Sequence, residues 1–229
     1  MQDGVTVVLT SSNRHDLLEK TLDSFVRHNT HKNIAGILIM EDSYVHPQFL
    51  DDNPKYKDYA ISVLLTRPRL GQLLGIDVAY KYVTTPYIFH CEDDWEFYAP
   101  GFIETSIPIL ESSPKMLQVH LRRIDEIFPM GVLNYTVDAT KKFAVIHEGK
   151  TEHGLWHGFS FNPGLRRLSD YKTLGSYSAQ LLTPRYNGQH FESYIGTIYK
   201  ELGYTTAISL FNDGQGFVRH IGEDRHVKD

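Results

Sequence analysis

Residues 87–97, YIFHCEDDWEF, join an apolar run to three consecutive acids. The run at residues 87–91 is typical of a strand that is covered on both faces of a sheet. Glu92, Asp93 and Asp94 follow it directly, and adjacent carboxylates repel one another unless a cation lies between them. Two interpretations are therefore open: a solvated loop in which the acids stay apart, or a metal site at the carboxyl end of a strand.

Strands and helices alternate around this stretch in the first half of the chain. Apolar runs rich in β-branched residues predict strands at residues 5–10, 34–40, 61–65 and 87–91. Apolar residues at helical spacing between residues 17 and 26 predict a helix with Asn13 as its N-cap, and Gly71 opens a second helix. This alternation predicts an α/β fold with a mostly parallel central sheet flanked by helices on both faces.

The second half of the chain is less regular. Further elements are predicted at residues 116–121, 143–147 and 204–210 (strands) and at residues 190–202 (a helix). Residues 151–165 are rich in glycine, histidine and aromatic residues, which is typical of binding loops. No repeat, low-complexity segment or proline- and serine-rich linker divides the chain, so we expect a single domain over residues 1–229.

Polar residues collect at and just past the ends of the predicted strands. They are residues 11–14 (SSNR) after the first strand, residues 41–43 (EDS) after the second, and Glu92, Asp93 and Asp94 after the fourth. The carboxyl ends of neighbouring parallel strands meet at one edge of the sheet, where such folds bind ligands. We therefore expect these residues to line one site, which favours the metal-site interpretation of the acids.

The composition excludes some classes of function. A net charge of −5 over 229 residues leaves no basic surplus to neutralise phosphates, so we expect no nucleic-acid partner. No stretch approaches the roughly 18–20 apolar residues of a membrane span, and the single cysteine, Cys91, fits a reducing compartment. We expect a soluble, cytoplasmic protein or an excised domain of a larger one, of unspecified oligomeric state. Local basic clusters at residues 67–69 and 166–167 would suit a small anionic ligand.

Several sequence blocks resemble the GT-A-fold glycosyltransferases of the family 2 type, whose fold is Rossmann-like. They are residues 5–25 (VTVVLTSSNRHDLLEKTLDSF), residues 37–43 (ILIMEDS) and residues 71–94. Residues 92–116 are also similar to the Glu-Asp-Asp region, a DXD-type motif, of N-acetylglucosaminyltransferases. The resemblance covers residues 5–115 well and residues 186–226 loosely. Glu92 stands where many relatives have Asp, and Asp77 stands where family 2 usually has Asn.

The resemblance implies a donor-binding half at about residues 1–115 and an acceptor-binding half at about residues 116–229. The residues implied to contact the nucleotide-sugar donor are Thr10, Ser11, Arg14, Asp42, Gly71, Gln72, Glu92, Asp93 and Arg225. Asp94 and His220 are implied to hold a divalent cation, Mn²⁺ or Mg²⁺. Such a cation typically takes only one or two ligands from protein and neutralises charge on a diphosphate leaving group.

Glu192 is the candidate general base. It lies in the first turn of the predicted late helix, beside the apolar stripe, where the helix dipole favours an ionised carboxylate. By the resemblance, inverting enzymes keep an acidic base at the start of such a helix, and this base deprotonates the acceptor hydroxyl. Asp170 and Asp213 are the alternatives, and an acid with only a dipole role is the competing interpretation.

Aromatic and terminal residues have two interpretations each. Trp95, Trp156 and His157 would bind the acceptor, because aromatic faces suit the apolar faces of sugars, or would anchor the core. Residues 220–226 (HIGEDRH) would close over the diphosphate or form a solvated tail. Gly71 and Gln72 would face the nucleotide or only cap a helix.

Together these features predict a metal-dependent hexosyltransferase of GT-A fold. It would move a sugar from a nucleotide diphosphate, with UDP as the first choice, to a hydroxyl of a glycan or other acceptor. The reaction would invert the anomeric centre if Glu192 is the base. A nucleotidyltransferase would share the sheet and the acid–metal site, but it would usually carry a glycine-rich basic phosphate loop, which residues 11–16 (SSNRHD) are not. A non-catalytic nucleotide-sugar or glycan-binding module is the alternative from another class.

Overall fold

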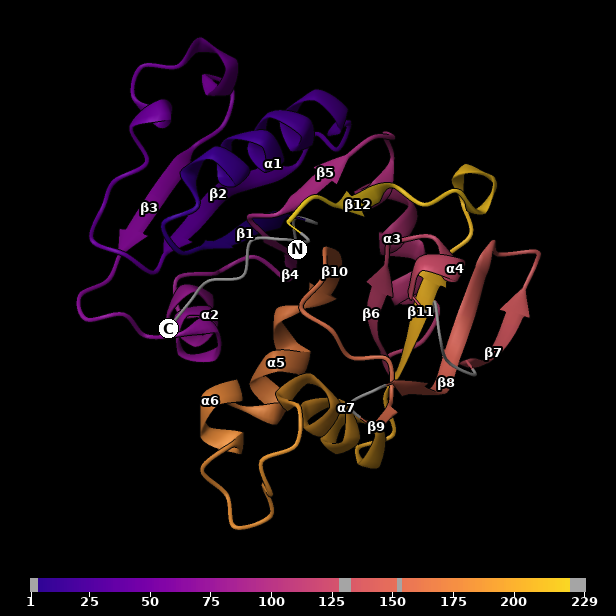
Figure 1. Ribbon diagram of the computed structural model, residues 1–229. Helices are drawn as coiled ribbons and strands as arrows, with labels where there is room; N and C mark the ends of the chain where they lie inside the picture. Colours follow the sequence, from indigo (N-terminus) through magenta and orange to yellow (C-terminus); the bar gives the residue numbers. More distant parts are fainter. Residues whose placement is uncertain (1–3, 128–132, 152–153, 223–229) are drawn as a thin grey trace.

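A mixed sheet runs through the centre of the molecule, with its strands in the order β3-β2-β1-β4-β10-β6-β11-β8-β7 (Figure 1). The computed structural model describes residues 4–127, 133–151 and 154–222. The first part of the sheet is parallel and consists of β1 (Val5–Ser11), β2 (Ile34–Glu41), β3 (Ile61–Leu65) and β4 (Tyr87–Glu92). These strands lie where the apolar runs predicted them, because each run supplies side chains to both faces of the sheet.

The second part of the sheet is mixed. Its strands are β6 (Met116–His120), β7 (Leu133–Asp138), β8 (Phe143–Thr151), β9 (Gly154–Trp156), β10 (Gly164–Arg167) and β11 (Thr205–Ser209). The strand β11 is parallel to β6 and antiparallel to β8, and β9 pairs with β8 off the main path. The predicted α/β fold with a mostly parallel central sheet flanked by helices is thus confirmed, with antiparallel strands added in the second half.

The short strand β10 joins the two parts, because it pairs antiparallel with both β4 and β6. The composition of residues 151–165 predicts a binding loop and gives no indication of this strand. Four residues are too few for an alternating pattern to show. Gly164 is required at its start, since a Cβ there would lie 2.6 Å from the carbonyl oxygen of Val119.

Helices cover both faces of the sheet. They are α1 (His15–His28), α2 (Gln72–Tyr80), α3 (Phe102–Glu111), α4 (Ile124–Ile127), α5 (Leu168–Leu174), α6 (Tyr177–Gln180) and α7 (Phe191–Glu201), with 3-10 turns η1 (Gln48–Leu50), η2 (Pro54–Tyr56) and η3 (Asn212–Gly214). In Figure 1, α1 lies on one side of the first strands, whereas α2, α5, α6 and α7 lie on the other. No helix within the described ranges combines the length and the apolar character that a membrane crossing requires.

Two core clusters fill the space between the sheet and these helices. Val7 and Leu9 of β1 pack with residues of α1 and α3, whereas Val8 packs with residues of α2, α5, α6 and α7. Successive residues of a strand point to opposite faces, so one apolar run serves both clusters. The sheet is therefore held between two apolar layers, and its strand ends stay fixed relative to one another.

The start of α1 differs from the prediction. Asn13 is not the N-cap: it adopts the left-handed conformation with φ 55° and donates its backbone N–H to Glu41 Oε1 at 2.7 Å. Arg14 occupies the cap position without capping the helix through its side chain. The tight turn after β1 thus leaves the Arg14 side chain available for the strand-end acids.

A small second sheet brings the end of the chain back to the acids. It pairs β5 (Trp95–Phe97) antiparallel with β12 (Val218–His220), and His220 lies opposite Trp95. The backbone N–H of Ile221 then donates to the carbonyl oxygen of Asp94 at 2.8 Å. This pairing places a late histidine directly beside the acidic triplet.

Candidate active site

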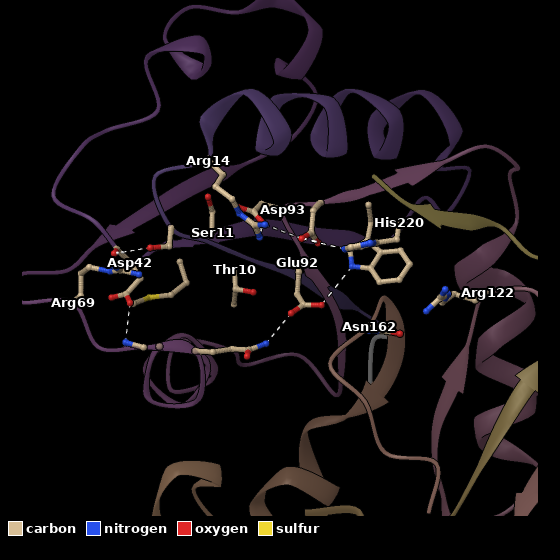
Figure 2. Close-up of a pocket in the computed structure, with 17 residues that line it drawn as sticks. Thr10, Ser11, Arg14, Asp42, Arg69, Glu92, Asp93, Arg122, Asn162 and His220 are labelled. Atoms are coloured by element: carbon tan, nitrogen blue, oxygen red, sulfur yellow. Dashed lines mark hydrogen bonds and ion pairs between the residues drawn. The ribbon is translucent and has the colours of Figure 1, made fainter. Parts of the chain in front are cut away.

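A cavity of about 540 Å³ opens at the carboxyl ends of β1, β2 and β4 (Figure 2). Its volume is in the range of small-ligand sites. The structure brings these predicted residues together in its wall: Thr10, Ser11, Arg14, Asp42, Gly71, Gln72, Glu92, Asp93, Asp94, Trp95 and His220. The edge of the parallel sheet thus collects side chains that are up to about two hundred residues apart in sequence.

Arg14 lies between two of the three acids. Its Nε donates to Asp93 Oδ2 at 3.1 Å, its Nη2 pairs with Asp93 Oδ1, and its Nη1 lies 2.9 Å from Asp94 Oδ2. Burial raises the pKa of the fully buried Asp93 to about 6, even though the guanidinium lowers it. The acids are therefore held together by a cation that the protein itself provides.

Asp94 is shared between Arg14 and the end of the chain. Its Oδ2 lies 3.3 Å from His220 Nε2, and a Cβ on Gly222 would lie 2.7 Å from this same oxygen. Burial raises the pKa of Asp94, but the hydrogen bonds and charges of His220 and Arg14 outweigh that effect and hold its pKa below the ordinary value. Asp94 is thus an ionised carboxylate in a confined position.

The donor atoms around Asp94 fit a divalent cation that binds mainly to its substrate. In the part of the chain that the structure describes, no three His, Cys, Asp or Glu side chains form a metal-binding group. Asp94 Oδ1 is nevertheless buried without a hydrogen-bond partner there, and the His220 ring lies beside the other oxygen. A single carboxylate with one imidazole suffices for Mg²⁺ or Mn²⁺ when a diphosphate and water complete the shell. Arg225, implied to contact phosphate, lies outside the described residues.

Glu92 lies in the cavity wall and accepts two hydrogen bonds, drawn as dashed lines in Figure 2. Gln72 Nε2 donates to its Oε1 at 2.7 Å, and Trp95 Nε1 donates to its Oε2 at 3.4 Å. Burial raises the pKa of Glu92 well above its ordinary value, and the carboxylates of Asp94 and Glu192 raise it further. The acids of the triplet therefore have different environments: the pKa of Asp94 lies below its ordinary value, whereas that of Glu92 lies above it.

Asp42 organises the opposite end of the cavity. Its carboxylate accepts hydrogen bonds from Thr66 Oγ1 at 2.6 Å, from Leu70 N at 2.7 Å and from Gly71 N at 2.8 Å. Gly71 has φ 75°, a conformation that glycine adopts without strain. Asp42, implied by the resemblance to contact the donor, thus also holds the loop that begins α2.

Glu192 lies in the first turn of α7, as predicted, but outside the cavity wall. Its Oε1 accepts hydrogen bonds from Phe161 N at 2.6 Å and from Ser160 Oγ at 3.3 Å. The two alternative bases are placed differently: Asp170 is buried and bonded to Arg167 and Tyr204, and Asp213 is exposed on η3. Of the three candidate bases, Glu192 is the one whose carboxylate raises the pKa of Glu92.

The aromatic candidates separate into two groups. Trp95 lines the cavity, although it is only 2% exposed and belongs to the main core cluster, with the His220 ring 5.1 Å from its own and the Arg122 guanidinium 5.3 Å from its ring centroid. Trp156 packs with Ile146 and Ile208 in a smaller core cluster away from the cavity wall, and its Nε1 donates to Phe159 O at 2.7 Å.

His157, next to Trp156, is partly buried, and burial lowers its pKa. Neither residue lines the cavity. Their placement gives the acceptor role no support, and it stays a prediction.

The cavity also contains residues that the sequence analysis did not assign to it. Arg69, Arg122 and Asn162 contribute polar groups to its wall (Figure 2). Arg69 belongs to the basic cluster at residues 67–69, which was expected to suit a small anionic ligand. Arg122 follows β6 and Asn162 precedes β10, and no sequence signal connected these two positions with the acids.

The second basic cluster does not face a ligand. Arg167 donates to the carbonyl oxygens of Leu110, Ser113 and Met116 and thereby caps the end of α3. Arg166 is buried among aromatic side chains, 2% exposed. The expectation of an anion site at residues 166–167 is therefore wrong, because the short strand β10 turns both side chains into the protein.

Comparisons with known proteins find similarity in structure but not in sequence. No family model matches the chain, and no curated protein does. The mannosyltransferase PcManGT from Pyrobaculum calidifontis, in complex with GDP-Man and Mn²⁺, has a TM-score of 0.59 at 15% identity, covering 88% of this chain and 53% of that one.

Two further solved structures have the same fold. GalNAc-T7 with UDP, GalNAc and Mn²⁺ has a TM-score of 0.67 at 12% identity, covering 95% of this chain and 43% of that one. S. aureus TarS 1–349 in complex with UDP-GlcNAc has a TM-score of 0.60 at 10% identity, with coverages of 98% and 62%. The chain thus spans about half the length of these structures, and it has the GT-A fold.

Proposed function

We propose that this chain is a metal-dependent glycosyltransferase that moves a sugar from a nucleotide diphosphate, most simply UDP, to a hydroxyl of a glycan or other acceptor. The observation that carries the proposal is the cavity at the carboxyl ends of β1, β2 and β4, where Asp42, Arg14 and the acidic triplet meet. The GT-A fold supports it, because the three similar structures contain nucleotides or nucleotide sugars by their names.

Donor binding is assigned to the first half of the chain, about residues 1–115. Asp42 is proposed to recognise the base, and Thr10, Ser11 and Arg14 the nucleotide. The free N–H groups at the start of α2, near Gly71 and Gln72, suit an anionic group of the donor. Glu92 and Asp93 complete the pocket for the ribose and the sugar.

Asp94 and His220 are proposed to hold a divalent cation. When bound, Mn²⁺ or Mg²⁺ neutralises negative charge on the diphosphate leaving group. The guanidinium of Arg14 would add a second positive charge near the diphosphate. It lies 2.9 Å from Asp94 and limits the repulsion between the carboxylates of the triplet. Arg225 stays a proposed phosphate contact.

Acceptor activation is assigned to the second half of the chain, about residues 116–229. Glu192 would take the proton of the acceptor hydroxyl, whose oxygen then bonds to the anomeric carbon of the donor sugar. The bond from that carbon to the diphosphate breaks, and the diphosphate leaves with the electron pair. Attack opposite to the leaving group inverts the anomeric centre. Trp95 is almost completely buried, so only the part of it in the cavity wall would contact the acceptor or donor sugar.

A two-stage experiment tests this function. Melting temperatures are measured with UDP, GDP and their sugars, with and without Mn²⁺, because a ligand that binds only the native state raises the melting point. The best donor is then incubated with mixed glycan acceptors and the products are analysed by mass spectrometry. Transfer that depends on Mn²⁺ supports the enzyme. Binding without turnover favours a nucleotide-sugar-binding module, and cleavage that attaches the nucleotide to the acceptor favours a nucleotidyltransferase.

A further inference from the structure

A buried hydrogen-bond network lies behind Glu192 and converges on Ser160. The Ser160 hydroxyl is 3.3 Å from Glu192 Oε1, and it also accepts the backbone N–H of Asn162 at 3.1 Å. An amide N–H is a donor only, so the one hydroxyl proton of Ser160 must point toward the carboxylate. With the N–H of Phe161, 2.6 Å from the same oxygen, two donors from adjacent residues fix Glu192 Oε1.

Two buried side chains fix the peptide that carries these donors. Gln118 is completely buried on β6: its Nε2 donates to Ser160 O at 2.9 Å, and its Oε1 accepts Ser160 N at 3.3 Å. Arg166 on β10 donates through Nη2 to the same carbonyl oxygen at 3.1 Å. Buried polar side chains that bond to the backbone in this way restrict it to one position, because breaking either bond leaves a polar group unpaired.

We propose that Ser160, locked by Gln118 and Arg166, is a positioning residue that aims the carboxylate of Glu192 at the acceptor hydroxyl. This inference rests on the proposed function and on Glu192 as its base. The same short segment carries Asn162 into the cavity wall (Figure 2). A fixed Ser160 peptide therefore sets the base relative to the cavity and does not merely fasten α7 to the core.

The size of the effect follows from how strictly proton transfer depends on geometry. A misplacement of about 1 Å can cost about 100-fold in rate, and a hydrogen bond to a charged group is stronger than one between neutral groups. Ser160→Ala keeps the Phe161 N–H on Glu192 but removes one of the hydrogen bonds that orient the carboxylate. We expect kcat to fall roughly 10- to 100-fold while the donor KM stays unchanged, since Ser160 does not line the donor pocket.

A double-mutant cycle distinguishes positioning from general stabilisation. Single-turnover transfer is measured for wild type, Ser160→Ala, Glu192→Gln and the double variant, with saturating donor. If Ser160 acts through Glu192, the double variant is as slow as Glu192→Gln alone, because there is no base left to position. Gln118→Met releases the Ser160 peptide from β6. When it is combined with Glu192→Gln, the double variant should again be as slow as Glu192→Gln alone.

Controls separate this inference from folding and from the proposed function. Ser106→Ala removes another buried hydroxyl, one that donates to Phe102 O within α3, and should leave transfer unchanged. Each variant must keep the donor-induced rise in melting temperature. Losses that multiply in the double variant overturn the positioning role while leaving Glu192 as the base. Near wild-type transfer by Glu192→Gln overturns the base assignment and the positioning role together.

Discussion

The side chain of Arg14 decides how three adjacent carboxylates can occupy one strand end. Its guanidinium contacts Asp93 and Asp94, so the buried negative charges are partly neutralised before any ligand binds. Burying a pair of charges costs desolvation free energy, which their attraction offsets only when the geometry is good and further hydrogen bonds form. Here the pair holds Asp94 beside His220, which is the arrangement that the proposed cation would need.

Asp94 is the residue whose replacement tests that cation most directly. Asp94→Asn keeps an oxygen that can accept from Arg14 and His220, so the fold should survive. The negative ligand is lost, and affinity for UDP in the presence of Mn²⁺ should fall by about 10- to 100-fold or more. Calorimetric titration with and without Mn²⁺ measures the change. Asp213→Asn, at an exposed acid outside the cavity, is the control, and equal affinities for the two variants would remove Asp94 from the metal site.

His120 gives a prediction for stability against pH. Burial lowers the pKa of His120 to about 4 in the folded protein, compared with about 6.5 in an unfolded chain. The unfolded chain therefore binds more protons between these values, so the contribution is complete above about pH 6.5 and is lost as the pH falls toward 4. His120→Gln removes the titration and can still donate to Gly158 O, which His120 Nε2 contacts at 2.6 Å.

Urea unfolding at pH 7 and pH 5 measures this difference. From pH 7 to pH 5 the wild type should lose about 2 kcal/mol more unfolding free energy than His120→Gln, at about 1.4 kcal/mol per pH unit below 6.5. The buried His90 is present in both proteins, so its own contribution cancels. Parallel pH dependences would show that His120 is protonated equally in the folded and unfolded states.

At the level of elements, two late segments complete a site that the first strands begin. The strand β12 brings His220 to Asp94, and the segment before β10 brings Ser160 and Asn162 to Glu192 and the cavity. Both segments depend on close backbone approaches. At Gly216, for example, an added Cβ would lie only 2.8 Å from the backbone nitrogen of Arg123, so a larger residue would clash there.

A substitution at Gly158 tests whether close contact with β11 positions the segment that precedes β10. It has φ +86°, and a Cβ there would lie 1.9 Å from Thr206 Oγ1 of the buried strand β11. Gly175 has nearly the same φ, +83°, but no atom within 4 Å of a Cβ. Gly175→Ala should cost about 1 kcal/mol for backbone strain alone, and Gly158→Ala about 1–3 kcal/mol more for overpacking. Denaturant unfolding compares the two, and equal losses would mean that the loop moves away from β11 without cost.

At the level of the whole molecule, the strand order separates the edge that carries the cavity from the far side of the sheet. The parallel strands β1, β2 and β4 end at the cavity, whereas β8, β9 and β7 lie beyond β11 at the far side of the sheet. Trp156 of β9 belongs to that far side, where it packs on Ile146 and Ile208. Its position in the sheet, and not its residue type, sets its role.

A pair of tryptophan variants checks this separation. Trp156→Phe should lower the unfolding free energy by about 1–2 kcal/mol, because the hydrogen bond to Phe159 O and part of the packing are lost. Its transfer kinetics should match wild type. Trp95→Phe, in the cavity wall and without the bond to Glu92, should instead change the KM for donor or acceptor. A raised acceptor KM in Trp156→Phe would return Trp156 to the acceptor site.

The sequence alone determined the first four strands, the helices α1 and α2, and the meeting of Ser11, Asp42 and the acidic triplet at one edge. These features follow from local patterns: a buried strand is a short apolar run, and the carboxyl ends of parallel strands share an edge of the sheet. The same patterns identified the helix that carries Glu192.

Only the tertiary structure decided which partners these residues have. Arg14 and Asp93 are 79 residues apart, Ser160 and Glu192 are 32 apart, and the strand β10 between β4 and β6 was too short to show a period. It also decided that Trp156 and Arg166 are buried and that His220 lies on Asp94. Contacts of this kind depend on the packing of whole elements around the sheet, so the residue type at a single position does not specify them.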